Sequence, residues 1–203
     1  MEDPVLLTGA GGAVGGAILD GLRDDYDWRL LYHSPPVEEP AFPYLVGDVV
    51  EEDTMAEAVE GVNAVIHLAG DPRPDAPWDS VLSNNIHGTK VTYQAAVEAG
   101  VEKLVYASSN HAVGHYETDR APDIYRPSGT LLLDGTEHPR PGNFYGVSKA
   151  ASEILGRFYH DEFGPSVVNV RIGNLTKGHP PKDYERGQAM WLSHRDCAHL
   201  FDC

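Results

Sequence analysis

A glycine-rich stretch near the start of the chain constrains the fold more than any other feature. Residues 8–16 read TGAGGAVGG, between the buried apolar run PVLLT and a segment with helical spacing of apolar residues. Glycines spaced G-x-x-G-x-x-G permit a tight turn, a close approach of a phosphate to the backbone, and close packing of helix on strand. The free N–H groups at the start of the helix then favour an anion. This order of strand, turn and helix predicts a nucleotide-binding unit, with the glycine pattern formed by Gly9, Gly12 and Gly15.

The alternation of strand and helix continues along the chain. Apolar runs predict six strands, at residues 4–8, 29–32, 44–48, 63–70, 102–109 and 166–174. Helical spacing predicts helices at residues 13–22, 54–59, 84–99 and 145–163, and Gly100 and Gly164 are expected to close the last two. Such alternation favours parallel strands with right-handed crossovers and helices on both faces. The expected fold class is therefore α/β, a doubly wound parallel sheet of the Rossmann type.

Residues 116–142 are polar and rich in proline and glycine, which predicts a long loop. Long loops in compact domains are usually functional, so this one is expected to cover the site. No second complete domain is indicated. We expect one dinucleotide-binding domain over residues 1–203, with residues 174–203 forming the start of a substrate-side segment.

The charge of the chain is strongly acidic. Aspartate and glutamate number 31 against 15 lysines and arginines, for a formal net charge of −16 over 203 residues. The acids are scattered along the sequence, which favours a halophilic protein, and an ordinary acidic cytosolic enzyme is the alternative. Such a field disfavours nucleic acid and anionic membranes as partners. With no apolar run of spanning length and two cysteines outside any CxxC pattern, a cytoplasmic protein with reduced thiols is expected.

Tyr145 and Lys149, in the stretch YGVSK, lie four residues apart and so on one face of the expected helix. A lysine ammonium stabilises a neighbouring phenolate, so such a tyrosine can act as general base toward a hydroxyl. The pattern also arises by chance as a surface pair. Ser109 favours the catalytic interpretation, because it ends an expected strand where a doubly wound sheet meets its ligand.

The order of these motifs resembles the extended short-chain dehydrogenase/reductase superfamily, which contains NAD-dependent epimerases and dehydratases. The resemblance implies that Tyr145 is the base, that Lys149 eases its deprotonation and holds the nicotinamide ribose, and that Ser109 orients the substrate. The matching stretches cover nearly the whole chain: TGAGGAVG (8–15), GDV (47–49), HLAG (67–70), NNIHGT (84–89), ASSNHAVG (107–114) and YGVSKA (145–150).

The same resemblance implies NAD as the cofactor. The residues that it places at the cofactor are Gly9, Gly12, Ala13, Val14, Gly15, Tyr32, Asp48, Val49, Leu68, Ala69, Gly70, Asn85, Tyr145, Lys149 and Ile172.

Finer motifs resemble the sugar-oxidising branch of the superfamily. SSNHAVG, GDPRPDAPW and VRIGN are similar to uronate dehydrogenases, and APWDSVL and ERGQAMWLS to haloarchaeal NAD-dependent glucose-6-phosphate dehydrogenases. This resemblance implies oxidation of the C1 hydroxyl of a cyclic sugar to a lactone, with glucose 6-phosphate as first substrate and a hexuronate as second. It implies substrate contacts from Ser109, Asn110, His111, Asn174 and Arg186, the last to a phosphate or a carboxylate.

Several of these residues have plainer interpretations. His111 is alternatively a loop histidine without function, and Arg186 an exposed arginine. His111 and His115 could share a metal if helical, but they follow a strand end, so no metal is expected. Arg171 lies inside a strand and is expected to form a structural ion pair. A nucleotide-sugar epimerase and a non-catalytic nucleotide sensor remain further alternatives for the whole chain.

The second expected strand lacks its usual acid. In dinucleotide-binding units an aspartate or glutamate about 20 residues beyond the glycine turn binds the ribose hydroxyls. Counted from Gly12 this position is Tyr32, in WRLLYHSPP, and no arginine follows at 32–36 to bind the 2′-phosphate of NADP. His33 and Ser34 offer weaker hydrogen bonds. The local chemistry therefore leaves NADP open beside the NAD that the resemblance implies.

The printed chain ends at Cys203, whereas the superfamily continues into a further C-terminal segment on the substrate side. A fragment and a shortened subunit with an open pocket are both consistent with this. A homodimer through the helices at 84–99 and 145–163 is usual for the superfamily and is expected here.

Overall fold

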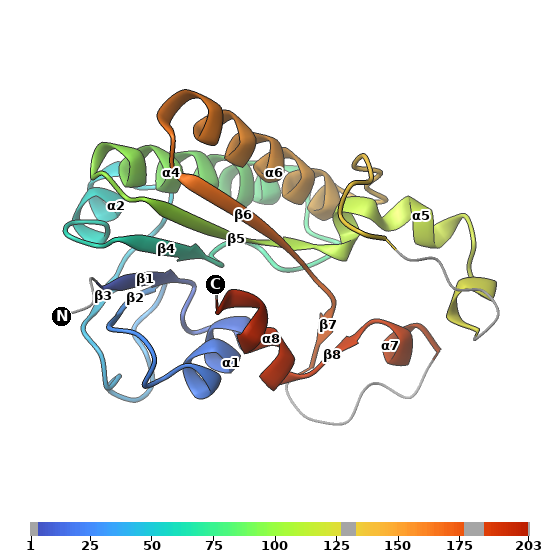
Figure 1. Cartoon of the computed structure of the whole chain (residues 1–203), viewed down its shortest axis with the longest axis horizontal. Helices are drawn as coiled ribbons and strands as arrows, with labels where there is room; N and C mark the ends of the chain where they lie inside the picture. Colours follow the sequence, from blue (N-terminus) through green and yellow to red (C-terminus); the bar gives the residue numbers. More distant parts are fainter. Residues whose placement is uncertain (1–3, 127–132, 177–184, 203) are drawn as a thin grey trace.

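Six parallel strands form one sheet in the order β3-β2-β1-β4-β5-β6 (Figure 1). The computed structural model describes residues 4–126, 133–176 and 185–202. This order, with β1 central and the direction of winding reversed beside it, is that of the Rossmann fold and confirms the expected class. The strands are β1 (Val5–Thr8), β2 (Trp28–Tyr32), β3 (Tyr44–Val46), β4 (Ala64–His67), β5 (Lys103–Ser109) and β6 (Ser166–Ile172).

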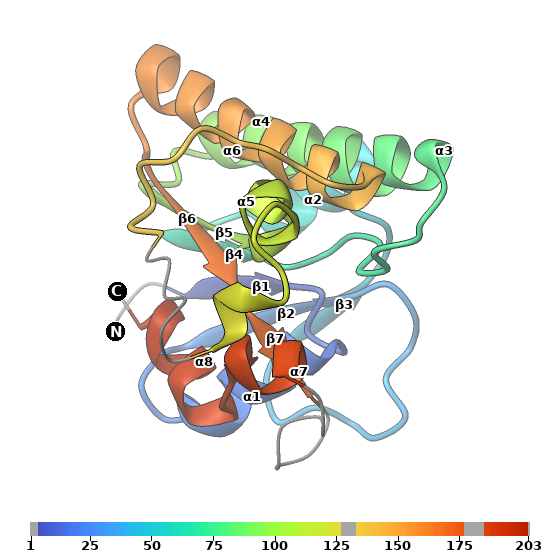
Figure 2. The same cartoon turned by 90° about the vertical axis from the view of Figure 1, so that its right-hand side faces the viewer.

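Helices cover both faces of the sheet (Figures 1 and 2). One face carries α2 (Glu52–Ala58), α4 (Gly88–Glu98) and α6 (Phe144–Phe163), and the other carries α1 (Ala13–Gly21) and α8 (His194–Phe201). The side chains of β1 alternate between the two layers, since Val5 and Leu7 belong to one core cluster and Leu6 to the other. Burial on both faces explains why this strand is an unbroken apolar run.

The strand ends point toward a group of short elements on one side of the molecule. Figure 2 looks onto these ends and shows α5 (Gly114–Thr118) and α7 (Glu185–Ala189) in front of the sheet. A small parallel pair, β7 (Asn174–Leu175) with β8 (Trp191–Leu192), continues from β6 beside them. In a doubly wound sheet the ligand lies at this end of the strands.

The helix expected at 84–99 begins earlier and is not uniform. It starts as α3 (Trp78–Ser80) after Pro77, widens into a π-helical segment, η1 (Val81–His87), and continues as α4. Pro77 suits the residue before a first turn, since it has no N–H group to leave unpaired. π-helical turns within α-helices are frequent at functional sites, and this one contains Asn85. Gly100 and Gly164 follow the helix ends with positive φ values of 78° and 92°, as expected.

The segment expected as a long loop at 116–142 is partly helical. A 3₁₀ turn, η2 (Asn110–Val113), leads into α5, and a second, η3 (Asp123–Tyr125), follows. These turns lack the apolar periodicity that announces a helix, and a polar contact between Tyr125 and Glu117 joins η3 to α5. Residues 127–132 of this segment lie outside the described residues.

Within the described ranges, no helix is both long and apolar enough to cross a membrane. Cys197 is a buried free thiol whose pKa is raised to about 11 by burial, so the thiolate is disfavoured. Cys203 lies outside the described residues.

Candidate active site

The glycine turn brings the ends of β1 and β4 into backbone contact. A Cβ atom on Gly9, whose φ is 71°, would lie 2.9 Å from the backbone nitrogen of Ala69. A Cβ atom on Gly15 would lie 2.6 Å from the carbonyl oxygen of Ala10. Gly12 precedes α1 in an extended conformation and, like its neighbour Ala13, is exposed. The turn therefore leaves accessible backbone at the start of α1, as a pyrophosphate requires.

Tyr32 lies beside this turn at the end of β2. Its ring packs against Gly11, where a Cβ atom would be 3.2 Å from Tyr32 Cδ1, and burial raises the pKa of the phenol. Asp48 accepts a hydrogen bond from the Val50 amide at 3.1 Å and lies 3.7 Å from His33 Nδ1. Val49, in contrast, is buried in the core. The end of β2 is thus aromatic and neutral, and the nearby carboxylate comes from the segment after β3.

Tyr145 and Lys149 lie together near the start of α6. The helix is capped by Asn143, whose side-chain oxygen accepts a hydrogen bond from the Gly146 amide at 2.7 Å. Lys149 Nζ is 5.6 Å from the centre of the Tyr145 ring and donates to the Ala107 carbonyl at 2.7 Å. Burial lowers the pKa of Lys149, and the neighbouring Tyr145 opposes that shift. The lysine of the expected pair is therefore buried and the tyrosine half-buried, so the two do not form a surface pair.

The turn after β5 brings three expected substrate contacts to the same place. Ser109 is buried and caps η2, accepting a hydrogen bond from the His111 amide at 3.2 Å. The His111 ring lies 5.6 Å from the Tyr145 ring, centre to centre. Asn110 carries a buried side-chain nitrogen that has no hydrogen-bond partner among the described residues. Since buried donors are seldom left unpaired, this amide indicates a place for a ligand oxygen.

His111 has a defined hydrogen-bonding state. The side-chain nitrogen of Asn143 lies 3.1 Å from His111 Nδ1, and an amide nitrogen only donates. Nδ1 of the neutral ring is therefore the acceptor, and Nε2 carries the proton. Burial and the charge of Arg186 lower the pKa of His111, and Glu117 opposes them. His111 thus presents a donor N–H at neutral pH.

The segment that carries the two histidines is helical, although it directly follows the end of β5. His111 lies in η2 and His115 in α5, so both are in helical turns. Ser109 produces this by capping the turn directly after the strand. His115 is exposed, and the described part of the chain contains no group of three or more histidine, cysteine or acidic side chains suited to hold a metal ion.

Arg186 of α7 lies at the margin of this group. Its Nε and Nη2 donate to the two carboxylate oxygens of Glu117 at 2.5 and 3.1 Å. Tyr125 of η3 donates to the same carboxylate. Hydrogen bonds from Arg186 and Tyr125 hold the pKa of Glu117 below its usual value against the effect of burial. Arg186 is therefore held near His111 by an ion pair that joins α5 to α7.

Asn85 joins the segment after β4 to the helix that carries Tyr145. Its Oδ1 accepts from the Asp71 amide at 2.6 Å, and its Nδ2 donates to Ser148 Oγ at 2.9 Å. Ser148 in turn donates to the carbonyl oxygen of Tyr145 at 2.7 Å. Gly70 passes so close that a Cβ atom would lie 2.7 Å from Asn85 Oδ1. Asn85 is thus buried in a structural network between the expected cofactor and catalytic residues.

The remaining expected contacts lie on the strands that lead into the site. Ile172 is buried and pairs with Ser109 across β5 and β6. Asn174 begins β7, where its amide donates to the Met190 carbonyl at 2.6 Å. Arg171 forms the expected structural ion pair, at 2.8 Å to Glu153.

Sequence reasoning missed three kinds of residue at the site. Asn143 could have been found, because asparagine is a favoured residue immediately before a helix. Glu117 and Tyr125 carry no such signal, since their contact with Arg186 joins segments that are far apart in the chain. His67 is a third omission, and its contacts are described below.

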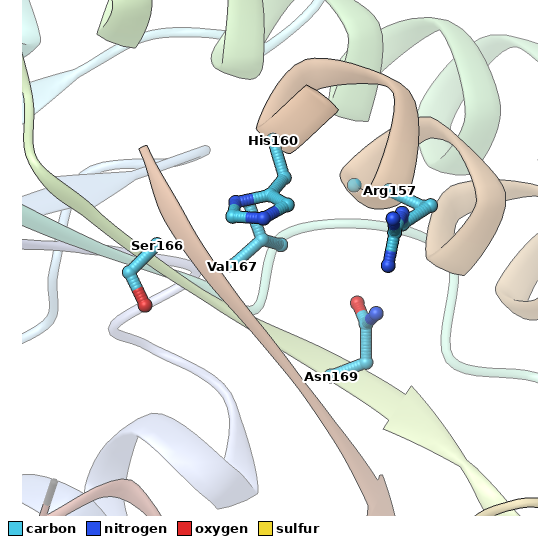
Figure 3. Close-up of a pocket in the computed structure, with 6 residues that line it drawn as sticks. Arg157, His160, Ser166, Val167 and Asn169 are labelled. Carbon is cyan, nitrogen blue, oxygen red and sulfur yellow. The ribbon is translucent and has the colours of Figure 1, made fainter. Parts of the chain in front are cut away.

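Two hollows adjoin α6, one near each end of the helix. One, of about 240 Å³, lies between the C-terminal half of α6 and the edge strand β6 (Figure 3). Its lining includes His160, some 11 residues beyond Lys149, a rise of about 16 Å along a helix. It is therefore not the candidate site. The other, of about 460 Å³, includes Asn143 in its lining and adjoins the start of α6.

Comparisons with known proteins agree with this geometry. NAD-dependent glucose-6-phosphate dehydrogenase of Haloferax volcanii is 64% identical over 210 residues, covering 100% of this chain and 80% of that protein. Uronate dehydrogenase of Pseudomonas syringae is 32% identical, covering 98% and 68%. The structure of an Agrobacterium tumefaciens uronate dehydrogenase variant complexed with NAD matches with a TM-score of 0.83 at 31% identity, covering 100% and 71%. The model of the NAD dependent epimerase/dehydratase family matches residues 5–191. The chain belongs to the NAD dependent epimerase/dehydratase family.

Proposed function

We propose that the protein oxidises the C1 hydroxyl of glucose 6-phosphate to the lactone, with NAD as the hydride acceptor. The observation that carries this proposal is the 64% identity, over the full chain, to the NAD-dependent glucose-6-phosphate dehydrogenase of Haloferax volcanii. The site supports it, since Tyr145, Lys149 and the Ser109–His111 turn lie together at the strand ends. The acidic chain is also consistent with a halophilic enzyme.

The glycine turn provides a place for the cofactor. The contacts at Gly9 and Gly15 leave no room for side chains there, and the accessible backbone at Gly12 and Ala13 fits a pyrophosphate at the start of α1. Leu68, Ala69 and Gly70 would line the opposite side, together with Val14. When bound, NAD supplies the acceptor for the hydride of C1. Tyr32 in place of an acid removes the charge that would repel a 2′-phosphate, so use of NADP beside NAD is part of the proposal.

The side chains of the protein manage the proton and the orientation of the sugar. Tyr145 would take the proton of the C1 hydroxyl, and the Lys149 ammonium would stabilise the resulting phenolate. Ser109 would hold the same hydroxyl. The unpaired amide nitrogen of Asn110 and the Nε2–H of His111 would donate to other sugar hydroxyls. Arg186 and Asn174 would contact the side of the sugar that carries the anion.

Formation of NADH tests the proposal. With purified protein, NAD and glucose 6-phosphate at high KCl, we expect the NADH absorbance band to rise, and to rise more slowly with glucuronate. NADH formation with glucuronate and none with glucose 6-phosphate would instead indicate the second candidate function, a hexuronate dehydrogenase. Arg186, a guanidinium near His111, could pair with the carboxylate of that candidate as well as with a phosphate. An epimerase would consume a nucleotide sugar without net NADH, and a nucleotide sensor would bind NAD without turnover of any sugar.

A homodimer through α4 and α6 is the proposed assembly. The two helices pack side by side on one face (Figure 1), and α6 exposes Phe144, Ile154 and Phe158, each at least 51% accessible. Ile154 and Phe158 lie one turn apart on this helix, and neighbouring exposed apolar side chains favour an interface. We expect the doubly substituted protein Ile154→Glu, Phe158→Glu to elute at half the wild-type mass in light scattering coupled to gel filtration. Equal masses for variant and wild type would contradict this assembly.

A further inference from the structure

A buried histidine lies at the point where the strand order reverses. Thr8 ends β1 and His67 ends β4, and the two are partners across the parallel pair. Both are essentially inaccessible, at 0% and 1% exposure. His67 Nδ1 lies 2.8 Å from Thr8 Oγ1, and its Nε2 lies 3.2 Å from Thr89 Oγ1 on α4. His67 therefore bridges the two central strands and the helix layer above them.

The hydrogen bonds around His67 fix its protonation. Thr8 Oγ1 accepts from the amides of Leu68 and Ala69 at 3.2 and 3.3 Å, so its own proton points to His67 Nδ1. Thr89 Oγ1 donates to the Asn85 carbonyl at 2.6 Å and so accepts from His67 Nε2. The ring is thus neutral, with its proton on Nε2. Burial, and then the charge of Lys149, lower the pKa of His67 to about 3, in agreement with this direction of bonds.

We propose that His67 is a positioning residue that aligns the cofactor-side turns with the helix carrying Tyr145 and Lys149; the role rests on the proposed function. On the Nδ1 side, Thr8 holds the amides of Leu68 and Ala69, the turn that touches Gly9.

The Nε2 side of His67 leads to the catalytic helix. Thr89 donates to the carbonyl of Asn85, whose side chain donates to Ser148. Ser148 donates to the carbonyl of Tyr145. Ser152 of the same helix also donates to Thr89 Oγ1, at 3.2 Å. The bonds of Asn85, Thr89 and Ser152 in this series are buried, where hydrogen bonds are strong and an unpaired group is costly, and the bond from Ser148 to Tyr145 is partly buried. Displacement of the Nε2 partner is therefore transmitted to α6.

The neutral state of His67 also matters for Lys149. The His67 ring stacks on Tyr106 with centres 5.8 Å apart, and Lys149 Nζ lies 4.8 Å from the centre of the same Tyr106 ring. A positive imidazole here would favour loss of the lysine proton. The ring stays neutral because Nδ1 accepts from Thr8 and Nε2 donates to Thr89, and the positive charge therefore stays on Lys149.

Two amide substitutions separate the two sides of His67. In His67→Asn, the short side chain places its oxygen where Nδ1 lies and keeps the bond from Thr8, but it does not reach Thr89. In His67→Gln, the longer side chain reaches Thr89 with its amide nitrogen but loses the acceptor for Thr8. We expect His67→Gln to raise the Kd for NAD about tenfold, the loss expected for one buried hydrogen bond, with a smaller change in kcat. We expect His67→Asn to lower kcat about tenfold and to change the Kd for NAD by less than about twofold.

The Kd is measured by calorimetric titration with NAD in the absence of sugar, and kcat from NADH formation with glucose 6-phosphate. A purely structural role would alter both quantities to similar extents in both variants, and that outcome, or no change in either, contradicts the proposal. If the substitutions at position 67 prevent folding, Thr8→Val and Thr89→Val are used instead. Thr8→Val removes the hydroxyl that bonds Nδ1 and the Leu68 and Ala69 amides. Thr89→Val removes the hydroxyl that bonds Nε2, the Asn85 carbonyl and Ser152. They are expected to change the Kd for NAD and kcat in the same directions as the Gln and Asn variants respectively. If the wild type binds NAD but does not oxidise the sugar, the proposed function fails while the titrations still decide the role of His67.

Discussion

Replacement of Tyr145 by phenylalanine is expected to lower the rate of glucose 6-phosphate oxidation by about a hundredfold or more, the range that general base catalysis supplies. The substitution removes the phenol oxygen that accepts the proton of the C1 hydroxyl, and it leaves the ring, its contact with His111 and the start of α6 in place. The Kd for NAD is expected to change little. Rates follow from NADH absorbance under saturating sugar and cofactor, and the Kd from calorimetry.

Tyr116→Phe is the matched control, because Tyr116 lies on α5 near the same site and its ring faces Arg140, a contact that survives loss of the hydroxyl. We expect its rate to stay within about threefold of the wild type, as for a surface substitution away from special contacts. Wild-type turnover by Tyr145→Phe would exclude this residue as the base.

Lowering the pH below about 6.5 is expected to reduce the free energy of unfolding through His67. In the folded protein the pKa of His67 is lowered to about 3, by burial first and by Lys149 second. In the unfolded chain the imidazole binds a proton near its ordinary pKa, so between the two values the unfolded state holds one more proton. The contribution of His67 to the free energy of unfolding is complete above the pKa that it has in the unfolded chain. Below that pKa it falls by roughly 1 kcal/mol or slightly more per pH unit, and it is lost as the pH approaches the pKa in the folded protein.

The measurement is the difference in unfolding free energy between wild type and His67→Asn, from urea titrations at fixed high KCl. Many carboxylates titrate in this range, and the difference isolates His67 from them. The other titratable groups near the His67 ring are the same in both proteins. Tyr93 and Tyr106 stay neutral, because burial raises the pKa of each phenol, and Lys149 is present in both. We expect the stability advantage of the wild type to shrink by about 2 kcal/mol or more between pH 7 and pH 4.5. A difference that is constant across this range would contradict a neutral, buried His67.

The central sheet and the catalytic pair were predictable because their signals are local. The run PVLLT is apolar throughout since β1 is buried on both faces, and the glycine turn after it must accommodate the backbone at Ala69. Tyr145 and Lys149 were found from a four-residue spacing that one helical face requires. Arg171 was correctly predicted as an ion-pair partner because charge inside a strand needs one.

Other features depend on contacts between distant segments and were not predictable. The turns around α5 follow from partners such as Ser109 and Asn143. The π-helical segment at Val81–His87 contains Asn85, whose partners Asp71 and Ser148 come from other segments. Glu117 meets Arg186 across 69 positions of the chain, and no pattern in either segment announces the pair. His67 reads as one more residue of an apolar strand, and its role emerges only when Thr8 and Thr89 are seen on its two sides.

The approach of Gly146 to the turn after β5 limits how specificity in this enzyme can be redesigned. A Cβ atom on Gly146 would overlap the carbonyl oxygen of His111. The side chain of Asn143 lies within hydrogen-bond distance of the ring of the same histidine. Residues 109–118 and the first turn of α6 therefore have to be replaced together in any redesign. When a substrate-binding segment from another protein is transplanted after β5, the residues at positions 143 and 146 must come with it. Otherwise the new segment will not pack against the start of α6.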